Sequence, residues 1–241
     1  MPTLQLDGNS PATIHYEEHG TGFPVLTLAP GGMRSFGDMW AKMPWNPVAE
    51  LSGDYRVITM DQRNAGSSTA PITGGEGWDT YAGDHIALLD HLGIERCHVV
   101  GMCIGGAFIL KLLTTAPERF ARAVALQPIG LDDNRQAFHD MFDGWADEVR
   151  PSHPEAADGA WTAYRSAMYD VTDQLFSVPT SVLPSITTPM LVLRGDDQYH
   201  PRSASELLAA TAPNAELIDH WKDPEHLPAT TTAIAEFLAA S

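Results

Sequence analysis

A cysteine framed by glycines is the feature of this sequence that could do chemistry. Cys103 lies within Gly101-Met102-Cys103-Ile104-Gly105, between an apolar run that ends at Val100 and an apolar helical run over 107–113. The G-x-C-x-G spacing at a strand-to-helix junction is typical of a nucleophile elbow, with cysteine where serine is usual. Small neighbours permit the tight turn. Because a helix N-terminus favours negative charge, we expect this turn to lower the thiol pKa and to stabilise an oxyanion.

The chain has a second cysteine, Cys97, six residues before Cys103. If the segment between them is a strand, their Cα atoms are roughly 20 Å apart at ~3.3 Å per residue, which is too far for a disulfide. Two free thiols fit a reducing compartment, and we expect a cytoplasmic protein. Cys97 begins an apolar strand and is expected to be a small core residue.

Composition narrows the classes of protein to which the chain can belong. Its 241 residues suit one α/β domain, and a hydrophobic content of 44% is enough for a core. The net charge of −17 reflects 31 acidic residues against 14 scattered basic ones. Because nucleic acids and anionic membranes both require clustered positive charge, we expect neither as a partner. No apolar run reaches the length of a membrane span.

The elements that must position Cys103 alternate along the chain. A hairpin is expected over 3–6 and 12–18, followed by apolar strands at 24–29, 55–60, 97–102, 122–127, 189–194 and 215–219. Helices are expected at 36–50, 78–92, 104–116, 203–212 and 229–240. This alternation predicts a doubly wound, mostly parallel sheet, whose ligands bind at the carboxyl ends of the strands. We expect a single domain over 1–241, with the aromatic-rich segment 128–185 as a small helical cap insertion.

The elbow, together with this order of elements, resembles the α/β-hydrolase superfamily over essentially the full length of the chain. In that fold the loop after the 24–29 strand reads His-Gly-x and donates an N–H to the oxyanion. Here Pro30 stands where His is usual and Gly31 matches the Gly. The resemblance therefore implies an oxyanion hole formed by the N–H groups of Gly32 and Ile104, with Met33 as a register-shifted alternative to Gly32.

The resemblance also implies an acid and a base. The acid follows the 189–194 strand, where Asp197 precedes Pro201 by the familiar interval of four residues; Asp196 is the fallback. The base follows the 215–219 strand. We prefer His226, which has the freedom of a loop, over His220, which lies almost within the strand. His200, close to Asp197, is a third candidate.

These residues predict a Cys103–His226–Asp197 triad. Imidazole titrates near neutrality and can relay the thiol proton, while a carboxylate fixes its tautomer. The predicted function is hydrolysis of an ester, lactone or thioester carbonyl through a thioacyl intermediate. The alternatives are an acyltransferase and a catalytically silent homologue that binds or senses a small molecule. The expected partner is a small-molecule acyl substrate, and a homodimer remains open. We expect no cofactor and no metal, because no convincing ligand cluster or dinucleotide fingerprint is present.

Overall fold

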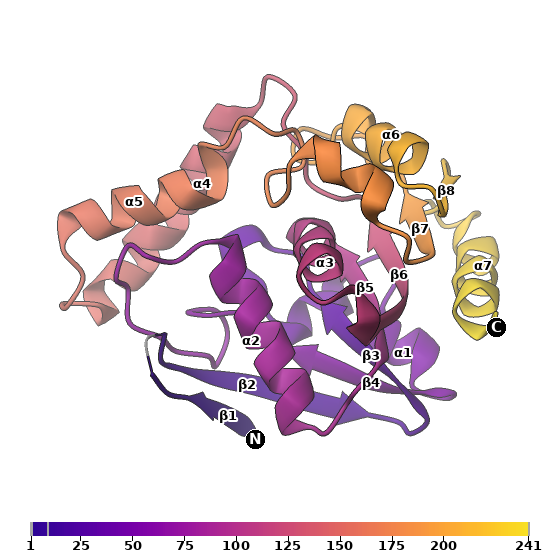
Figure 1. The fold of residues 1–241 in the computed structure, drawn as a ribbon, viewed down its shortest axis with the longest axis horizontal. Coiled ribbons are helices and arrows are strands. Elements are labelled where there is room, and N and C mark those ends of the chain that lie inside the picture. Colours follow the sequence, from indigo (N-terminus) through magenta and orange to yellow (C-terminus); the bar gives the residue numbers. More distant parts are fainter. Residues whose placement is uncertain (1, 9, 241) are drawn as a thin grey trace.

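A twisted sheet crosses the whole molecule in the computed structural model, which describes residues 2–8 and 10–240. Within these residues eight strands form one sheet in the order β1-β2-β4-β3-β5-β6-β7-β8 (Figure 1). The strands are β1 (Thr3–Leu6), β2 (Ala12–His19), β3 (Phe23–Leu28), β4 (Tyr55–Met60), β5 (Cys97–Met102), β6 (Phe120–Leu126), β7 (Met190–Leu193) and β8 (Ala215–Ile218).

The sheet is mostly parallel. β1 and β2 pair in antiparallel fashion, as do β2 and β4, while every pair from β4 to β8 is parallel. All six residues of β5 are buried, as expected for a central strand covered on both faces. The predicted hairpin and the doubly wound α/β-hydrolase architecture are both confirmed.

Helices cover both faces of the sheet. They are α1 (Pro47–Leu51), α2 (Trp78–His91), α3 (Ile104–Thr115), α4 (Arg135–Val149), α5 (Asp158–Tyr169), α6 (Arg202–Thr211) and α7 (Leu227–Ala239). Short 3₁₀ turns lie at Gly32–Arg34, Gly37–Lys42, Pro117–Arg119, Arg150–Ser152 and Thr180–Ser185. Apolar residues of α2, α3 and α6 join the core on one face, and those of α1 and α7 form the core on the other. In the described part of the chain no helix is long and apolar enough to cross a membrane.

One expected helix, 36–50, is broken in two. A 3₁₀ turn covers Gly37–Lys42, and α1 begins only at Pro47. The break follows from proline chemistry, because Pro44 cannot continue a helix and Pro47 suits a first helical position. The side chain of Asn46 caps α1 by accepting a 3.0 Å hydrogen bond from the Val48 N–H. The two tryptophans of this region, at 40 and 45, are buried in the core under the sheet.

The segment between β6 and β7 holds α4 and α5, which lie side by side and apart from the helices that flank the sheet (Figure 1). α4 buries an apolar stripe with members at helical spacing. These buried residues are Phe138, Phe142, Trp145 and Ala146. Their aromatic rings meet those of α5, with Phe142 and Tyr164 in edge contact at 5.3 Å. The α4–α5 pair is therefore held together by an aromatic cluster of its own.

Candidate active site

Cys103 occupies a sharp turn between β5 and α3. Its backbone has φ 61° and ψ −118°, a conformation that is unusual for a residue other than glycine and is typical of strained functional turns. The two flanking glycines are required by close approach. A Cβ on Gly101 would lie 2.6 Å from the carbonyl carbon of Gly105, and one on Gly105 would lie 2.3 Å from the carbonyl oxygen of Leu28. The glycine frame seen in the sequence is thus the frame that the elbow needs.

An Asp–His pair lies on the loop that follows β7. Nδ1 of His200 is 2.7 Å from Oδ1 and 2.9 Å from Oδ2 of Asp197. Asp197 Oδ1 also accepts hydrogen bonds from the backbone N–H groups of Tyr199 and His200, at 3.0 and 3.1 Å. The hydrogen bond from His200 is the largest of the influences that lower the pKa of Asp197 to about 2. The carboxylate is therefore ionised at neutral pH and fixes the orientation of the ring.

The structure brings His200 to the thiol of Cys103. Burial opposes ionisation of Cys103, but the nearby charge of His200 acts in the other direction, and the net effect lowers the thiol pKa. Burial likewise opposes protonation of His200, but the Cys103 thiolate and Asp197 raise the pKa of His200 to about 9. Nε2, the ring nitrogen of His200 that does not bond Asp197, is buried and has no hydrogen-bond partner among the described residues. Catalytic contacts are commonly loose before substrate binds. Each of the two side chains therefore favours the charged form of the other.

Two backbone N–H groups also face the sulfur. The backbone N–H groups of Gly31 and Ile104 lie close enough to the Cys103 sulfur to help lower its pKa. Ile104 was expected in this place. Gly31 precedes the expected donor, Gly32, by one residue; Gly32 lines the same cavity. Two donors that converge beside the nucleophile are what an oxyanion hole requires.

The imidazoles after β8 lie elsewhere. His220 and His226 stack on each other, with ring centroids 5.5 Å apart, and Nδ1 of His226 is 3.6 Å from the Asp223 carboxylate. Neither is among the described residues that line the cavity at Cys103. The loop is tied down instead by Trp221, which donates a 2.9 Å hydrogen bond to the Arg194 carbonyl. The structure therefore does not assemble the expected Cys103–His226 pair.

The spacing in the sequence contained a signal for His200. An aspartate three residues before a histidine can turn the chain back on itself, and here the backbone N–H of His200 is 3.2 Å from the Asp197 carbonyl oxygen. Pro201 then opens the way to α6. The fallback acid, Asp196, points away from this pair and forms an ion pair with Lys222.

A small apolar cavity opens onto Cys103. Its volume is about 220 Å³, below the several hundred Å³ of pockets that enclose drug-sized ligands. The lining is mostly apolar and aromatic. It consists of Gly31, Gly32, Cys103, Ile104, Ile129, Phe138, Met141, Tyr169, Tyr199 and His200. α4 and α5 thus contribute side chains to the cavity.

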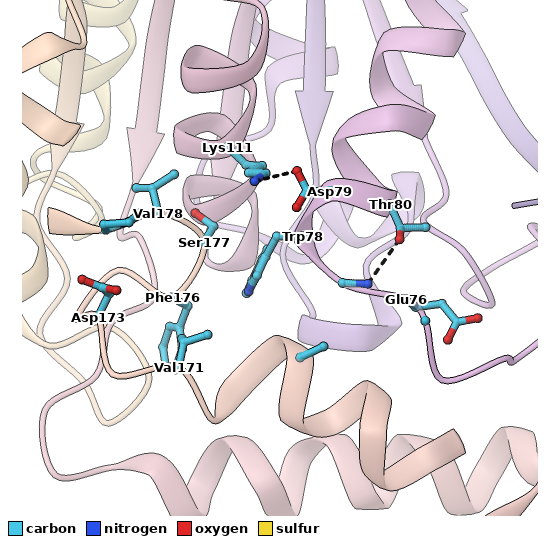
Figure 2. A pocket seen from close by; sticks show the side chains of 14 residues that line it. Glu76, Trp78, Asp79, Thr80, Lys111, Val171, Asp173, Phe176, Ser177 and Val178 are labelled. Carbon is cyan, nitrogen blue, oxygen red and sulfur yellow. Dashed lines mark hydrogen bonds and ion pairs between the residues drawn. The ribbon is translucent and has the colours of Figure 1, made fainter. Parts of the chain in front are cut away.

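A larger pocket, of about 440 Å³, lies at the start of α2 (Figure 2). Cys103 is not among the described residues that line it. Its charged groups are already paired: Lys111 Nζ is 2.7 Å from Asp79, and Glu76 accepts hydrogen bonds from the backbone N–H groups of Thr73 and Gly74. The second thiol, Cys97, is buried, and burial raises its pKa to about 12. Of the two thiols, only that of Cys103 has a lowered pKa.

Among the residues that the structure describes, no group of three or more His, Cys, Asp or Glu side chains could hold a metal ion.

Comparison with known proteins agrees with the fold described above. The family model described as the alpha/beta hydrolase fold matches residues 24–182, more than half of the chain. A 2-hydroxy-6-oxononadienedioate/2-hydroxy-6-oxononatrienedioate hydrolase from Paraburkholderia phymatum is 26% identical over 270 residues, covering 97% of this chain and 93% of the relative.

Two solved structures share the fold over nearly the whole chain. The enol-lactonase from Burkholderia xenovorans LB400 superposes with a TM-score of 0.74 at 20% identity, covering 99% of this chain and 100% of the other. A thermophilic esterase from Thermogutta terrifontis gives a TM-score of 0.73 at 21% identity, covering 99% and 98%. The curated relatives include several named hydrolases, and the chain belongs to the alpha/beta hydrolase fold family.

Proposed function

We propose that this protein hydrolyses an ester, lactone or thioester bond, with Cys103 as nucleophile, His200 as general acid and base, and Asp197 as the group that orients His200. The observation that carries the proposal is the placement of these groups: Cys103 and His200 line one cavity, and Asp197 holds Nδ1 of His200 at 2.7 Å. In keeping with this placement, each of Cys103 and His200 favours the charged form of the other. Thiolate is the nucleophilic form of cysteine, so a lowered thiol pKa favours attack on a carbonyl. His200 takes the role that the sequence assigned to His226.

In the first half of the reaction the Cys103 thiolate adds to the carbonyl carbon of the substrate. The carbonyl electron pair moves onto oxygen, and the amides of Gly31 and Ile104 stabilise this oxyanion. When the carbonyl re-forms, the bond to the leaving group breaks and Nε2 of His200 gives that group its proton. The products are a free alcohol or thiol and a thioacyl enzyme with neutral His200.

In the second half, water replaces the leaving group. Neutral His200 accepts a proton from water as its oxygen adds to the thioacyl carbon, and the same two amides hold the second oxyanion. Collapse breaks the carbon–sulfur bond and releases the acid, with the thiolate and imidazolium restored. The net reaction consumes one water and cleaves one acyl bond.

The cavity limits the substrate class. With a volume of about 220 Å³ and an apolar lining, it fits a small acyl group. None of the described lining residues is Lys or Arg, and the one cationic group, His200, is already paired with Asp197. An uncharged acyl group is therefore favoured. We further propose that the α4–α5 segment within 128–185 acts as the cap of a single domain, because it lines this cavity over the carboxyl end of β5.

The relatives support carbonyl hydrolysis as the reaction class, since they include an enol-lactonase and an esterase. Acyl transfer is the second candidate. An apolar cavity offers water few hydrogen-bond partners, so an alcohol or thiol acceptor could compete with water for the thioacyl group. We keep the expectation of a cytoplasmic, reducing location, because both cysteines are free.

The test is intact-protein mass spectrometry after mixing with p-nitrophenyl acetate and p-nitrophenyl butyrate. The proposal expects release of p-nitrophenol and an acyl adduct that maps to Cys103 and is lost in Cys103→Ala. Product analysis with added methanol or 2-mercaptoethanol separates hydrolysis from acyl transfer. Absence of both adduct and turnover would contradict the proposal and favour the silent binding homologue.

A further inference from the structure

The hydroxyl group of Tyr169 lies in the candidate active site and has only a weak hydrogen-bond partner. Tyr169 is the last residue of α5, is fully buried and lines the cavity at Cys103. Its hydroxyl donates to Sδ of Met33, at 3.6 Å. A thioether sulfur is a weak acceptor, so this contact satisfies the phenol poorly. Buried hydroxyl groups normally find a better partner.

The neighbouring tyrosine shows the contrast. Tyr164, one turn earlier on α5, is equally buried, and its hydroxyl is hydrogen-bonded to the hydroxyl of Tyr81. That pair lies away from the cavity lining and satisfies both phenols within the protein. The hydroxyl that lacks an oxygen or nitrogen partner is the one that lines the cavity at the nucleophile.

The Tyr169 ring is held in a fixed orientation. It stacks on Phe138 with centroids 5.4 Å apart and meets Phe176 edge-on at 5.6 Å. The backbone is fixed as well, because the Arg135 guanidinium donates hydrogen bonds to the carbonyl oxygens of Tyr169 and Val171. A hydroxyl held this rigidly loses little entropy when it binds a ligand.

We propose that the Tyr169 hydroxyl binds substrate, by donating a hydrogen bond to a neutral oxygen such as an ether or ketone on the acyl group. This inference rests on the proposed function. The acyl group is the part of the substrate that stays attached to Cys103 through both half-reactions, so it is the part that the cavity must hold. The substrate class is accordingly a small ester, lactone or thioester whose acyl chain carries an uncharged oxygen acceptor.

A neutral acceptor fits better than a carboxylate for two reasons. A second anion in this cavity would face the Cys103 thiolate in apolar surroundings. The phenol also stays a donor at every working pH, because burial and the nearby Tyr81 and Cys103 raise the pKa of Tyr169 well above its usual value.

The experiment compares two esters with acyl chains of the same length. p-Nitrophenyl 3-methoxypropanoate carries an ether oxygen where p-nitrophenyl pentanoate carries a methylene. The ratio of their kcat/KM values is measured for the wild type and for Tyr169→Phe. Because the intrinsic reactivities of the two esters are the same for both enzymes, they cancel in the comparison. The ratio is expected to fall about 3- to 10-fold in Tyr169→Phe, as for the loss of one neutral hydrogen bond.

Two controls separate substrate binding from a structural role. Tyr164→Phe removes the hydroxyl of a buried tyrosine of α5 that is not among the described cavity-lining residues, and it should leave the ratio within twofold of wild type. Thermal unfolding should show little change for Tyr169→Phe, since only a weak sulfur contact is lost. Tyr164→Phe, which breaks the paired hydroxyls, should lower Tm more.

The outcomes are distinct. An unchanged ratio in Tyr169→Phe, with both esters still turned over, overturns the inference and leaves the proposed function intact. A preference that appears only when the ether is moved into the alcohol part overturns the assignment to the acyl group. If the wild type neither turns over nor is acylated by either ester, the proposed function fails and this inference fails with it.

Discussion

Asp197 and His200 lie three residues apart on one loop, and Nδ1 of His200 is 2.7 Å from the Asp197 carboxylate. The acid and the candidate base are therefore positioned by a single turn after β7. In that turn the Asp197 carboxylate also holds the backbone N–H groups of Tyr199 and His200. The orientation of the imidazole is set locally and does not depend on the loop after β8.

The first prediction separates the two candidate bases. His200→Ala should lower kcat/KM by at least about 100-fold, because it removes both the charge that lowers the pKa of Cys103 and the proton donor of the proposed reaction. His226→Ala should stay within about twofold of wild type, because the His226 ring stacks on His220 away from the cavity. Steady-state hydrolysis of p-nitrophenyl butyrate measures both. If His226→Ala lost activity and His200→Ala kept it, the base would be His226 in the loop after β8.

A second prediction concerns the acid. Asp197→Asn removes a negative partner of His200, so the pKa of His200 should fall below its value of about 9. The alkaline limb of the kcat/KM profile should move to lower pH, with activity at neutral pH down by about 100-fold. Asp196→Asn is the matched control. Its carboxylate pairs with Lys222, so the limb should stay in place. If the alkaline limb moved in Asp196→Asn and not in Asp197→Asn, Asp196 would be the acid that orients His200.

The order of elements and the glycine frame of Cys103 follow from local physics, which is why they could be predicted from the sequence. Apolar β-branched runs form buried strands wherever the chain places them. Gly101 and Gly105 are dictated by backbone atoms only a few residues away or on the neighbouring strand. Asp197 was implied as the acid by the resemblance to the α/β-hydrolase superfamily, and the structure places its carboxylate beside the imidazole of His200.

The identity of that imidazole depends on the conformations of two loops. The loop after β8 offered His220 and His226, but Trp221 fixes it to the carbonyl of Arg194. The turn after β7 brings His200 to the sulfur instead. The shift from Gly32 to Gly31 at the second amide has the same origin, since one residue of register in a loop decides which N–H faces the sulfur.

A third prediction uses the contrast between the two thiols. At pH 7 iodoacetamide should modify Cys103 and leave Cys97 unmodified, because charge and hydrogen bonds lower the pKa of Cys103 while burial raises that of Cys97 to about 12. The rate should fall as the pH drops through the Cys103 pKa and the thiolate is protonated. Peptide mapping over pH 4–9 measures both sites. Equal labelling of the two cysteines would remove the case for an activated thiol.

A fourth prediction concerns the pH dependence of turnover, which Cys103 and His200 should set together. The productive state needs ionised Cys103 and protonated His200, so kcat/KM should follow a bell-shaped curve whose alkaline limb lies near 9. The stability of the folded protein should depend on pH in the same direction. Since folding raises the pKa of His200, the stabilising contribution of this side chain is complete below its pKa in the unfolded chain. That contribution is lost as the pH rises through about 9. In His200→Ala this alkaline loss of stability should be smaller, as thermal unfolding at pH 7 and pH 10 would show.

The last prediction tests the elbow through its glycines. In Gly105→Ala the new methyl would meet the Leu28 carbonyl oxygen at 2.3 Å, and backbone cannot yield as a flexible side chain would. The free energy of unfolding should fall by about 1–3 kcal/mol, as for other overpacked sites. Gly83→Ala is the control, since Gly83 lies within α2 with nothing near its Cβ position. There alanine should stabilise the protein by about 0.5–1 kcal/mol, because it favours the helix. Chemical denaturation of both variants measures the free energies of unfolding. A Gly105→Ala variant as stable as wild type would show that close packing against β3 does not require glycine at position 105.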